Sequence, residues 1–459
     1  MRCKCGHGMT LPTRADADQI LQQAQGLFLQ GRIAAARALV LPVLAAWPEH
    51  VDCLQLTGLI AQQERDLEGA QTLLTQAAAL APARADVRSN LGSLLRVLGC
   101  GAAALAQLEH AARLAPDNGL IQINLGLVQQ DLGLLALAEV SMRQAVAIDP
   151  ESAAAHQNLG HLLMLSDLQQ SRRHLIRALQ LQPGLHAAFK DLCAVLISSG
   201  EPTPALRLCE ARLRSVPDDQ DAIAMMALAL RDVGQVAQAD RLVDCATSLR
   251  CFALAPPPAY DSIVSFNAAL LAHVLAHPRL TAVLHGNATH HGKRINDLLA
   301  APLGPVALLQ QMILAQIGAY RQAQQDQRDC DEQRHVQDFE TASDGNSSPR
   351  EQLRCWAVLM HRNGHETPHL HPDGRISGVY YVALPDVMNS ADTTHAGWIE
   401  FGQPDPSFAT RSTVPTLPVQ PQAGQMLLFP SYFWHRTIPF QSDQPRLSIA
   451  FDLCPLAAG

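Results

Sequence analysis

The sequence has no excess of basic residues. Its 34 lysines and arginines are outnumbered by 42 aspartates and glutamates, which gives a net charge of −8 at pH 7. A protein that binds nucleic acid or an anionic membrane surface needs a basic face to meet the phosphates. We therefore expect no nucleic acid and no membrane among its partners.

Long apolar runs and paired cysteines are also missing. No stretch reaches the roughly 18 uninterrupted apolar residues that cross a bilayer, and residues 1–16 lack the apolar core of a signal peptide, so we expect them to form a disordered tail. The 11 cysteines are odd in number and include no C-x-x-C pair, which indicates neither a disulfide framework nor a zinc ribbon. These absences favour a reducing, cytoplasmic location.

The first half of the chain contains a repeat. Prolines recur every 33 or 34 residues, at positions 48, 82, 116, 150, 183 and 217. A self-similar period of this size indicates stacked helical hairpins. Each unit has a small residue where two helices must come close, namely Gly26, Gly58, Gly92, Gly126, Gly160, Cys193 and Ala227. Glycine inside a helix costs about 1 kcal/mol relative to alanine, so its recurrence implies close packing.

Twelve residues after the small residue an alanine recurs, at positions 38, 70, 104, 138, 205 and 239, with Arg172 as the exception in a repeat that is one residue short. These positions resemble the tetratricopeptide repeat over residues 17–252. The resemblance implies an all-α superhelix whose concave groove binds peptides or protein segments. The alternative is a spacer or a dimerisation surface. Leucine and alanine replace most aromatic residues of the family pattern, so the groove's ligand stays undefined.

Three consecutive prolines in CFALAPPPAYDS end the helical pattern, so we place a second domain over residues 257–459. Residues 262–322 still have the pattern of amphipathic helices. Residues 323–350 are polar and nearly free of large apolar side chains, and we expect a mobile connector or lid there. Beyond residue 352, short apolar runs between Gly, Pro, Asp and Ser predict the strands of an antiparallel barrel or jelly roll. The predicted fold class is α+β and multidomain.

Histidines gather in the stretch HETPHLH at 365–371, beside one predicted strand. In an extended segment, His369, His371 and Asp373 would point to the same side. His435 follows the predicted strand GQMLLFP and could reach the same point across the mouth of a barrel. Two imidazoles and a third ligand on one face leave coordination positions open, which suits iron(II) that must also bind a co-substrate and oxygen.

A positively charged side chain lies on the last predicted strand. Arg446 and Ser448 lie on the same face of RLSIAF. The guanidinium can grip a carboxylate with two hydrogen bonds, and the hydroxyl can add a third. The pair could anchor a dicarboxylate whose other end chelates the metal. Trp356 and Trp398 are interpreted as barrel packing.

The motifs PHLHPDGRISGVYYVALP, GQMLLFPSYFWH and RLSIAF resemble those of the 2-oxoglutarate and iron(II)-dependent oxygenases of the double-stranded β-helix fold. The resemblance implies that His435 is the distal iron ligand, that Arg446 and Ser448 bind the C5 carboxylate of 2-oxoglutarate, and that Tyr380 or Tyr381 lines that pocket. For the remaining ligands it favours His369 with His371, because the most similar branch has H-x-H here. His371 with Asp373 is the alternative.

The resemblance implies a dioxygenase that converts 2-oxoglutarate to succinate and CO₂ while it hydroxylates a substrate. Because a peptide-binding repeat precedes the barrel, we expect a protein or peptide side chain as the substrate, recruited by the repeat groove. One alternative is a non-catalytic scaffold or adaptor with a degenerate metal-binding barrel. Another is a small-molecule oxygenase whose repeats serve oligomerisation. The oligomeric state stays open.

Overall fold

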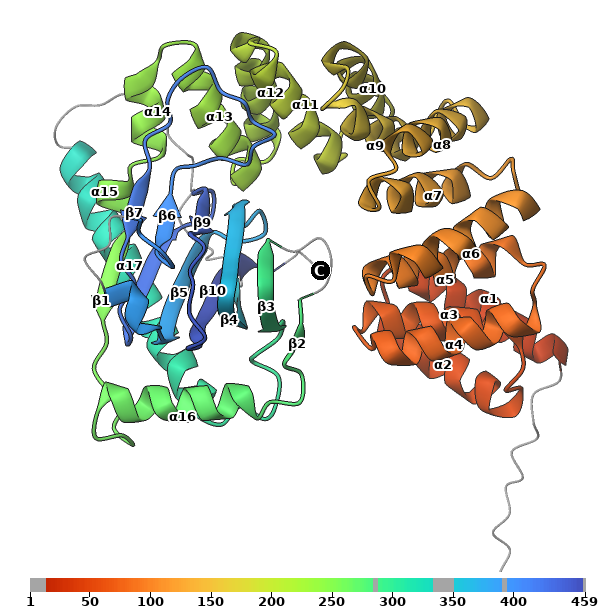
Figure 1. The fold of residues 1–459 in the computed structure, drawn as a ribbon, viewed down its shortest axis with the longest axis horizontal. Coiled ribbons are helices and arrows are strands. Elements are labelled where there is room, and N and C mark those ends of the chain that lie inside the picture. Colours follow the sequence, from red (N-terminus) through yellow and green to blue (C-terminus); the bar gives the residue numbers. More distant parts are fainter. Residues whose placement is uncertain (1–13, 284–287, 333–350, 390–393, 457–459) are drawn as a thin grey trace, which may run out of the picture. The chain divides into compact units, whose positions relative to one another are not determined.

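The computed structural model describes residues 14–283, 288–332, 351–389 and 394–456 (Figure 1). The tail expected over 1–16 lies outside these residues up to position 13, and the first helix begins at Arg14. Contacts divide the chain into two compact units, Met1–Ala188 and Phe189–Gly459. This division falls inside the predicted repeat array, so its last helices belong to the same unit as the predicted barrel.

The first unit consists of helical hairpins, as the repeat predicts. Its helices are α1 (Arg14–Leu29), α2 (Ile33–Ala46), α3 (Val51–Gln63), α4 (Leu67–Leu80), α5 (Ala85–Val97), α6 (Gly101–Leu114), α7 (Gly119–Asp131), α8 (Leu135–Ile148), α9 (Ala153–Leu163) and α10 (Leu168–Leu181). The second helix of each hairpin ends two residues before a periodic proline, which cannot continue a helix.

Close packing explains most of the recurring glycines. A Cβ atom on Gly58, Gly92 or Gly160 would lie within 2.8 Å of a leucine side chain on the partner helix, at Leu74, Leu108 and Leu175 respectively. Any larger residue would push the paired helices apart. These contacts confirm the close approach that the sequence predicts for these units.

Two details of the repeat prediction are wrong. A Cβ atom on Gly26 would meet nothing within 4 Å, so the first hairpin has no close approach at this position. In the short repeat, α9 has 11 residues, and the shift places Ser171 rather than Arg172 at the alanine position. Ser171 is buried, and its hydroxyl donates to the backbone oxygen of Gly160 at 2.6 Å.

The second unit begins with further hairpin helices and continues into the sheet. Its helices are α11 (His186–Ser198, which starts in the first unit), α12 (Pro202–Ser215), α13 (Gln220–Asp232), α14 (Val236–Leu242), α15 (Cys245–Ser248), α16 (Ile263–Leu275) and α17 (Val306–Glu332), with the 3₁₀ turn η1 (Asp386–Asn389). Its strands are β1 (Arg250–Ala253), β2 (Thr281–Ala282), β3 (Thr289–Ile295), β4 (Glu351–His369), β5 (Ile376–Ala383), β6 (Ile399–Phe401), β7 (Leu417–Val419), β8 (Gln425–Pro430), β9 (His435–Thr437) and β10 (Arg446–Pro455).

The strands pair in the order β1-β8-β5-β10-β4-β9-β6-β7, with β3 joining β4 and β2, and every pair is antiparallel. Alternate residues separate the two faces. On β10, Leu447, Ile449 and Phe451 pack in one core with residues of α16 and α17, whereas Arg446 and Ser448 face the opposite side. The predicted fold class, helical repeats followed by an antiparallel barrel, is confirmed, and α16 and α17 cover the face of the sheet opposite Arg446 and Ser448.

Three expectations about the second half need correction. The segment 262–322, expected to consist of amphipathic helices, is not all helical, because residues 289–295 form β3, which pairs with β4. The connector predicted over 323–350 is helical up to Glu332, where it extends α17; this part, AQQDQRDCDE, contains no Pro or Gly to end the helix. Residues 333–350 lie outside the described residues. Residues 250–252, assigned to the array, belong to β1, which pairs with β8.

The last hairpins contact the barrel within the second unit. The hydroxyl of Tyr432 donates to the backbone oxygen of Leu242 at 2.9 Å, and Asp232 accepts from the backbone N–H of Ser412 at 2.9 Å. Ser198 accepts from the backbone N–H of Ala409 at 3.1 Å. Helices α11, α13 and α14 are thus hydrogen-bonded to loops of the barrel.

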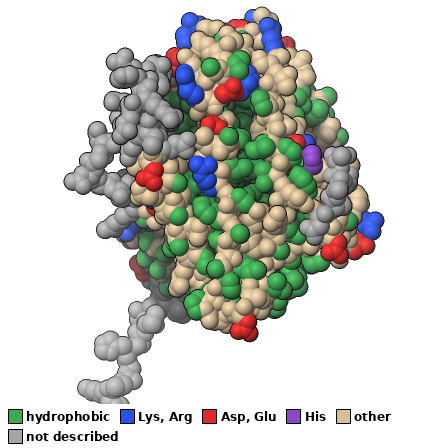
Figure 2. Space-filling model, turned by 90° about the vertical axis from the view of Figure 1, so that its left-hand side faces the viewer, with side chains coloured by type: hydrophobic (Ala, Val, Ile, Leu, Met, Phe, Trp, Pro, Cys, Tyr) green, Lys and Arg blue, Asp and Glu red, His purple; other side chains and the backbone are tan. Residues whose placement is uncertain are grey.

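The face drawn in Figure 2 carries hydrophobic side chains in its middle, with basic and acidic side chains interspersed around them. Among the described helices, none is both long enough and apolar enough to cross a membrane.

Candidate metal centre and its pocket

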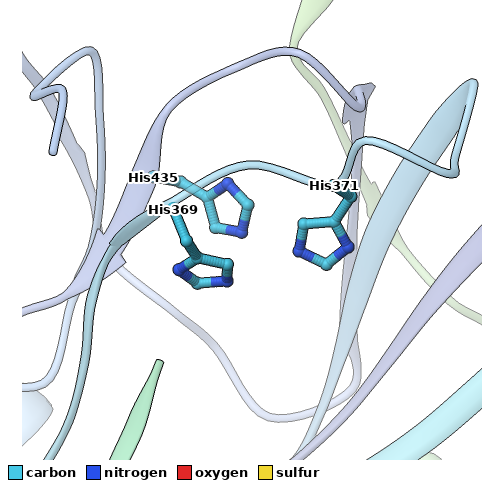
Figure 3. A group of neighbouring side chains, drawn as sticks. All are labelled: His369, His371 and His435. Atoms are coloured by element: carbon cyan, nitrogen blue, oxygen red, sulfur yellow. The ribbon is translucent and has the colours of Figure 1, made fainter. Parts of the chain in front are cut away.

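Three of the predicted ligands come together at one point. His369 ends β4, His371 follows two residues later, and His435 begins β9. Strands β4 and β9 are neighbours, and their register sets His369 directly opposite His435. One ring nitrogen of each histidine lies within 4.8 Å of the other two, and Figure 3 shows the three rings facing one another. This group could hold a metal ion.

In each of the three histidine rings, Nδ1 is hydrogen-bonded to an acceptor oxygen. His369 Nδ1 lies 2.7 Å from the backbone oxygen of Thr367, and His435 Nδ1 lies 2.9 Å from that of Phe433. His371 Nδ1 lies 2.8 Å from both carboxylate oxygens of Asp452. A carbonyl or carboxylate can only accept, so Nδ1 carries a proton in each ring, and Nε2 has a free lone pair whenever the ring is neutral. Metal-binding histidines use this arrangement to fix ring orientation.

The acid–base properties of the rings differ. Burial lowers the pKa of His435 well below its usual range, with the nearby His369 and His371 adding to the effect. Burial also lowers the pKa of His369, although the carboxylate of Glu366 opposes it. For His371 burial acts in the same direction, but the charge and hydrogen bond of Asp452 outweigh it and raise the pKa. Two of the rings are therefore held in the neutral form that binds metal.

Asp373 does not join this group. Its side chain is largely exposed, and it accepts from Arg354 at 3.1 Å in a surface ion pair. The segment does not stay extended after His371, because β4 ends at His369 and a turn follows. Alternation therefore fails between His371 and Asp373, and the alternative ligand pair is not brought together.

Arg446, Ser448 and Tyr381 line the same pocket as the three histidines, as the sequence predicts for a carboxylate site. Arg446 is 2% exposed, and its Nη1 donates to Ser448 Oγ at 3.2 Å. Its Cζ lies 5.5 Å from the centre of the Tyr381 ring. No carboxylate among the described residues forms an ion pair with it. A buried guanidinium in this state is costly unless a ligand supplies acceptors.

The phenol of Tyr381 also lacks a partner. Its hydroxyl is buried without a hydrogen bond, and burial raises its pKa, so it keeps its proton and can donate. The pocket has about 420 Å³ of empty volume, some of it open to solvent. Its donors therefore suit the carboxylate of a small diacid.

Sequence reasoning missed three residues of this pocket. Asp452, which orients His371, lies on the same face of β10 as Arg446 and Ser448, so strand alternation could have found it. Trp356, expected only to pack, lines the pocket and stacks on His371 with ring centres 5.4 Å apart. Glu366 lines it too, and no alternation rule finds it because the register shifts between Glu366 and His369.

The donor set fits an iron ion. His371 Nε2 is buried without a hydrogen-bond partner, and a metal would satisfy it. Three imidazoles on one side leave positions open for a chelating co-substrate and for oxygen. Arg446, which forms no ion pair with a carboxylate of the described residues, and the unbonded hydroxyl of Tyr381 lie in the same pocket, as a co-substrate with a distal carboxylate requires.

Similar solved structures cover part of the chain. PilF of Pseudomonas aeruginosa is 18% identical with a TM-score of 0.40, and the match covers 45% of this chain and 94% of that chain. The type IV pilus biogenesis factor PilW is 18% identical with a TM-score of 0.42, over 45% of this chain and 96% of that chain. YrrB, described as a TPR protein with an unusual peptide-binding site, is 20% identical with a TM-score of 0.31, over 38% and 91%. The comparison with curated proteins finds no match.

A family comparison covers the barrel. Residues 354–452 match the family described as "Putative 2OG-Fe(II) oxygenase". This range contains all three clustered histidines together with Arg446, Ser448 and Asp452. Over these residues the chain is similar to the 2OG-Fe(II) oxygenase family, as the sequence motifs predict, and the helical hairpins of the first unit agree with the predicted repeat pattern.

Proposed function

We propose that the chain is an iron(II)- and 2-oxoglutarate-dependent dioxygenase that hydroxylates a protein or peptide side chain. The observation that carries the proposal is one pocket with two unsatisfied requirements. A buried imidazole nitrogen of His371 lacks a partner beside two further histidines, and the buried guanidinium of Arg446 has no carboxylate. Iron(II) and a diacid would satisfy both.

In this proposal His369, His371 and His435 hold the iron through Nε2. When bound, the iron, with 2-oxoglutarate and oxygen, supplies the oxidising power that hydroxylates the substrate as 2-oxoglutarate is converted to succinate and CO₂. The chain's own contribution is orientation. Thr367, Phe433 and Asp452 accept from the Nδ1 atoms and keep the rings pointing inward.

The distal carboxylate of 2-oxoglutarate would lie against Arg446, with Ser448 and Tyr381 as further donors. Charge-assisted hydrogen bonds of this kind are about twice as strong as neutral ones. Val358, Ile399 and Phe429 give the pocket apolar walls. Such walls exclude water and strengthen the electrostatic interactions inside.

The choice of a peptide substrate rests on the repeat array. In the first unit, residues of α1, α3 and the start of α5 line a hollow with about 530 Å³ of empty volume, among them Phe28, Gln55 and Arg84, which immediately precedes α5. This hollow has both apolar and charged walls, as a peptide site requires. It supports the recruitment of a protein segment by the array.

The experiment is succinate formation by the full-length protein with iron(II), 2-oxoglutarate and oxygen, followed by mass spectrometry. We expect succinate to form without substrate at a slow uncoupled rate and to increase with a substrate peptide that gains one oxygen atom. His435→Ala should abolish both. A protein that folds and binds iron but forms no succinate under any condition would contradict the proposal and favour the scaffold.

A further inference from the structure

A second arginine lies beside the pocket, on the same side of the sheet. Arg294 of β3 pairs with Val358 of β4, and Val358 pairs on its other side with Ser448 of β10. Residues paired across neighbouring antiparallel strands point to the same face of a sheet. Val358 and Ser448 line the pocket, so Arg294 is directed to the pocket side of the barrel.

The guanidinium of Arg294 is stacked but not hydrogen-bonded. Its Cζ lies 5.0 Å from the centre of the Trp356 ring, which stacks on His371. Its Nε is buried without a hydrogen-bond partner, and no carboxylate of the described residues forms an ion pair with it. Such a group is costly to bury, because its planar donors need acceptors. A ligand with a carboxylate would supply them.

Arg294 does not duplicate Arg446. The two arginines come from β3 and β10, on either side of β4, so their strands are separated by about 10 Å. The pocket's own carboxylate, Glu366, accepts from the hydroxyls of Thr289 and Thr437 rather than from either arginine. Arg446 thus lines the pocket and Arg294 lies beside it, stacked on Trp356; the charge of Glu366 attracts both guanidinium groups, but neither forms a direct ion pair with a carboxylate of the described residues.

We propose that the substrate carries a carboxylate that Arg294 binds, while Arg446 holds 2-oxoglutarate. This inference rests on the proposed function and deepens it by naming the substrate class. An arginine fork discriminates against an amide of the same shape, because the amide replaces an acceptor oxygen with a donor NH₂. The carboxylate could belong to an acidic side chain or to a chain terminus.

The experiment is equilibrium dialysis of labelled probes against the full-length protein, kept anaerobic with iron(II) and saturating 2-oxoglutarate. The side-chain pair is N-acetyl-aspartate amide and N-acetyl-asparagine amide. The terminal pair is N-acetyl-alanine and its amide. We expect at least one carboxylate probe to bind ten times more tightly than its amide, and the preferred pair identifies the source.

The variants are Arg294→Gln and the charge-preserving Arg294→Lys, with Arg279→Gln as the matched control because Arg279 donates to the backbone oxygen of Asp297 outside the pocket. Arg294→Gln should reduce the preference to less than twofold, Arg294→Lys should keep part of it, and the control should keep all of it.

Three outcomes would overturn the inference: no carboxylate preference in the wild-type protein, an unchanged preference in Arg294→Gln, or a tenfold loss of 2-oxoglutarate affinity in that variant. Failure of the wild-type protein to bind 2-oxoglutarate would instead contradict the proposed function itself.

Discussion

At the scale of single residues, the candidate centre depends on the groups behind the histidines. His369 and His435 donate to backbone oxygens, which no substitution removes, whereas His371 donates to the Asp452 side chain. Asp452 also accepts from Ser377 at 2.7 Å, so its carboxylate is itself held in place. The orientation of His371 can therefore be changed by a substitution at Asp452 that leaves the histidine itself in place.

Asp452→Asn should weaken iron(II) binding about 10- to 100-fold, because the ring loses the carboxylate that orients it and makes it more basic. Anaerobic iron titration would measure the change. Asp373→Asn is the matched control, since Asp373 lies in a surface pair with Arg354. A large loss of affinity in Asp373→Asn, with none in Asp452→Asn, would show that the alternative ligand set is the correct one.

Iron binding should also depend on pH through His371. Its pKa in the metal-free protein is raised, so the ring must lose a proton before it can bind. Affinity should be constant above that pKa and fall about tenfold per pH unit below it. In Asp452→Asn the pKa of His371 should drop, so the loss of iron(II) affinity should begin at a lower pH than in the wild-type protein. An affinity that does not change between pH 5 and 8 would contradict this assignment.

At the scale of elements, alternation along β10 could be predicted in full. Arg446, Ser448 and Asp452 share one face, while Leu447 and Ile449 share the other. The pairing of distant strands could not be predicted, because it depends on register. Residues 289–295 fall within the range expected to be helical, because THHGKRI lacks the apolar alternation that indicates a strand. Their pairing with β4, which the sequence does not reveal, makes them strand β3.

The tight packing around Gly378 of β5 leads to a prediction about the stability of the barrel. A Cβ atom there would lie 2.3 Å from Phe451 Cζ and 2.7 Å from the backbone oxygen of Leu427. Gly378→Ala should therefore destabilise the barrel by about 1–3 kcal/mol. Thermal unfolding would measure this change.

Gly318→Ala is the control for that change. Gly318 lies in α17, and a Cβ atom would meet nothing within 4 Å. Because alanine is the better helix former, this variant should be stabilised by about 0.5–1 kcal/mol. Equal effects of the two substitutions would contradict the packing described for β5.

At the scale of the whole molecule, the repeat array is not uniform in its contacts. Proline and glycine periodicity predicts the hairpins, but it does not show that Leu242 and Asp232 in the last hairpin are hydrogen-bonded to the barrel. These contacts join segments far apart in sequence, and no local pattern encodes them. The second unit therefore includes helices that a repeat-based boundary assigns elsewhere.

Removal of residues 1–184 should leave the uncoupled rate of succinate formation within twofold of the full-length rate, because the barrel keeps its helical neighbours. Removal of residues 1–250 should lower the melting temperature, since it deletes Ser198, Asp232 and Leu242. A peptide substrate recruited by the array should lose turnover in the first truncation, whereas a small-molecule substrate should not.

The central claim is that one pocket holds iron(II) on three histidines and 2-oxoglutarate on Arg446. Its most direct test is anaerobic titration of the full-length protein with iron(II) and 2-oxoglutarate, followed through the weak visible metal-to-ligand band. We predict a band that saturates at one iron per chain, disappears in His435→Ala, and needs at least tenfold more 2-oxoglutarate in Arg446→Gln. No band in the wild-type protein, or an unchanged band in His435→Ala, would contradict the claim.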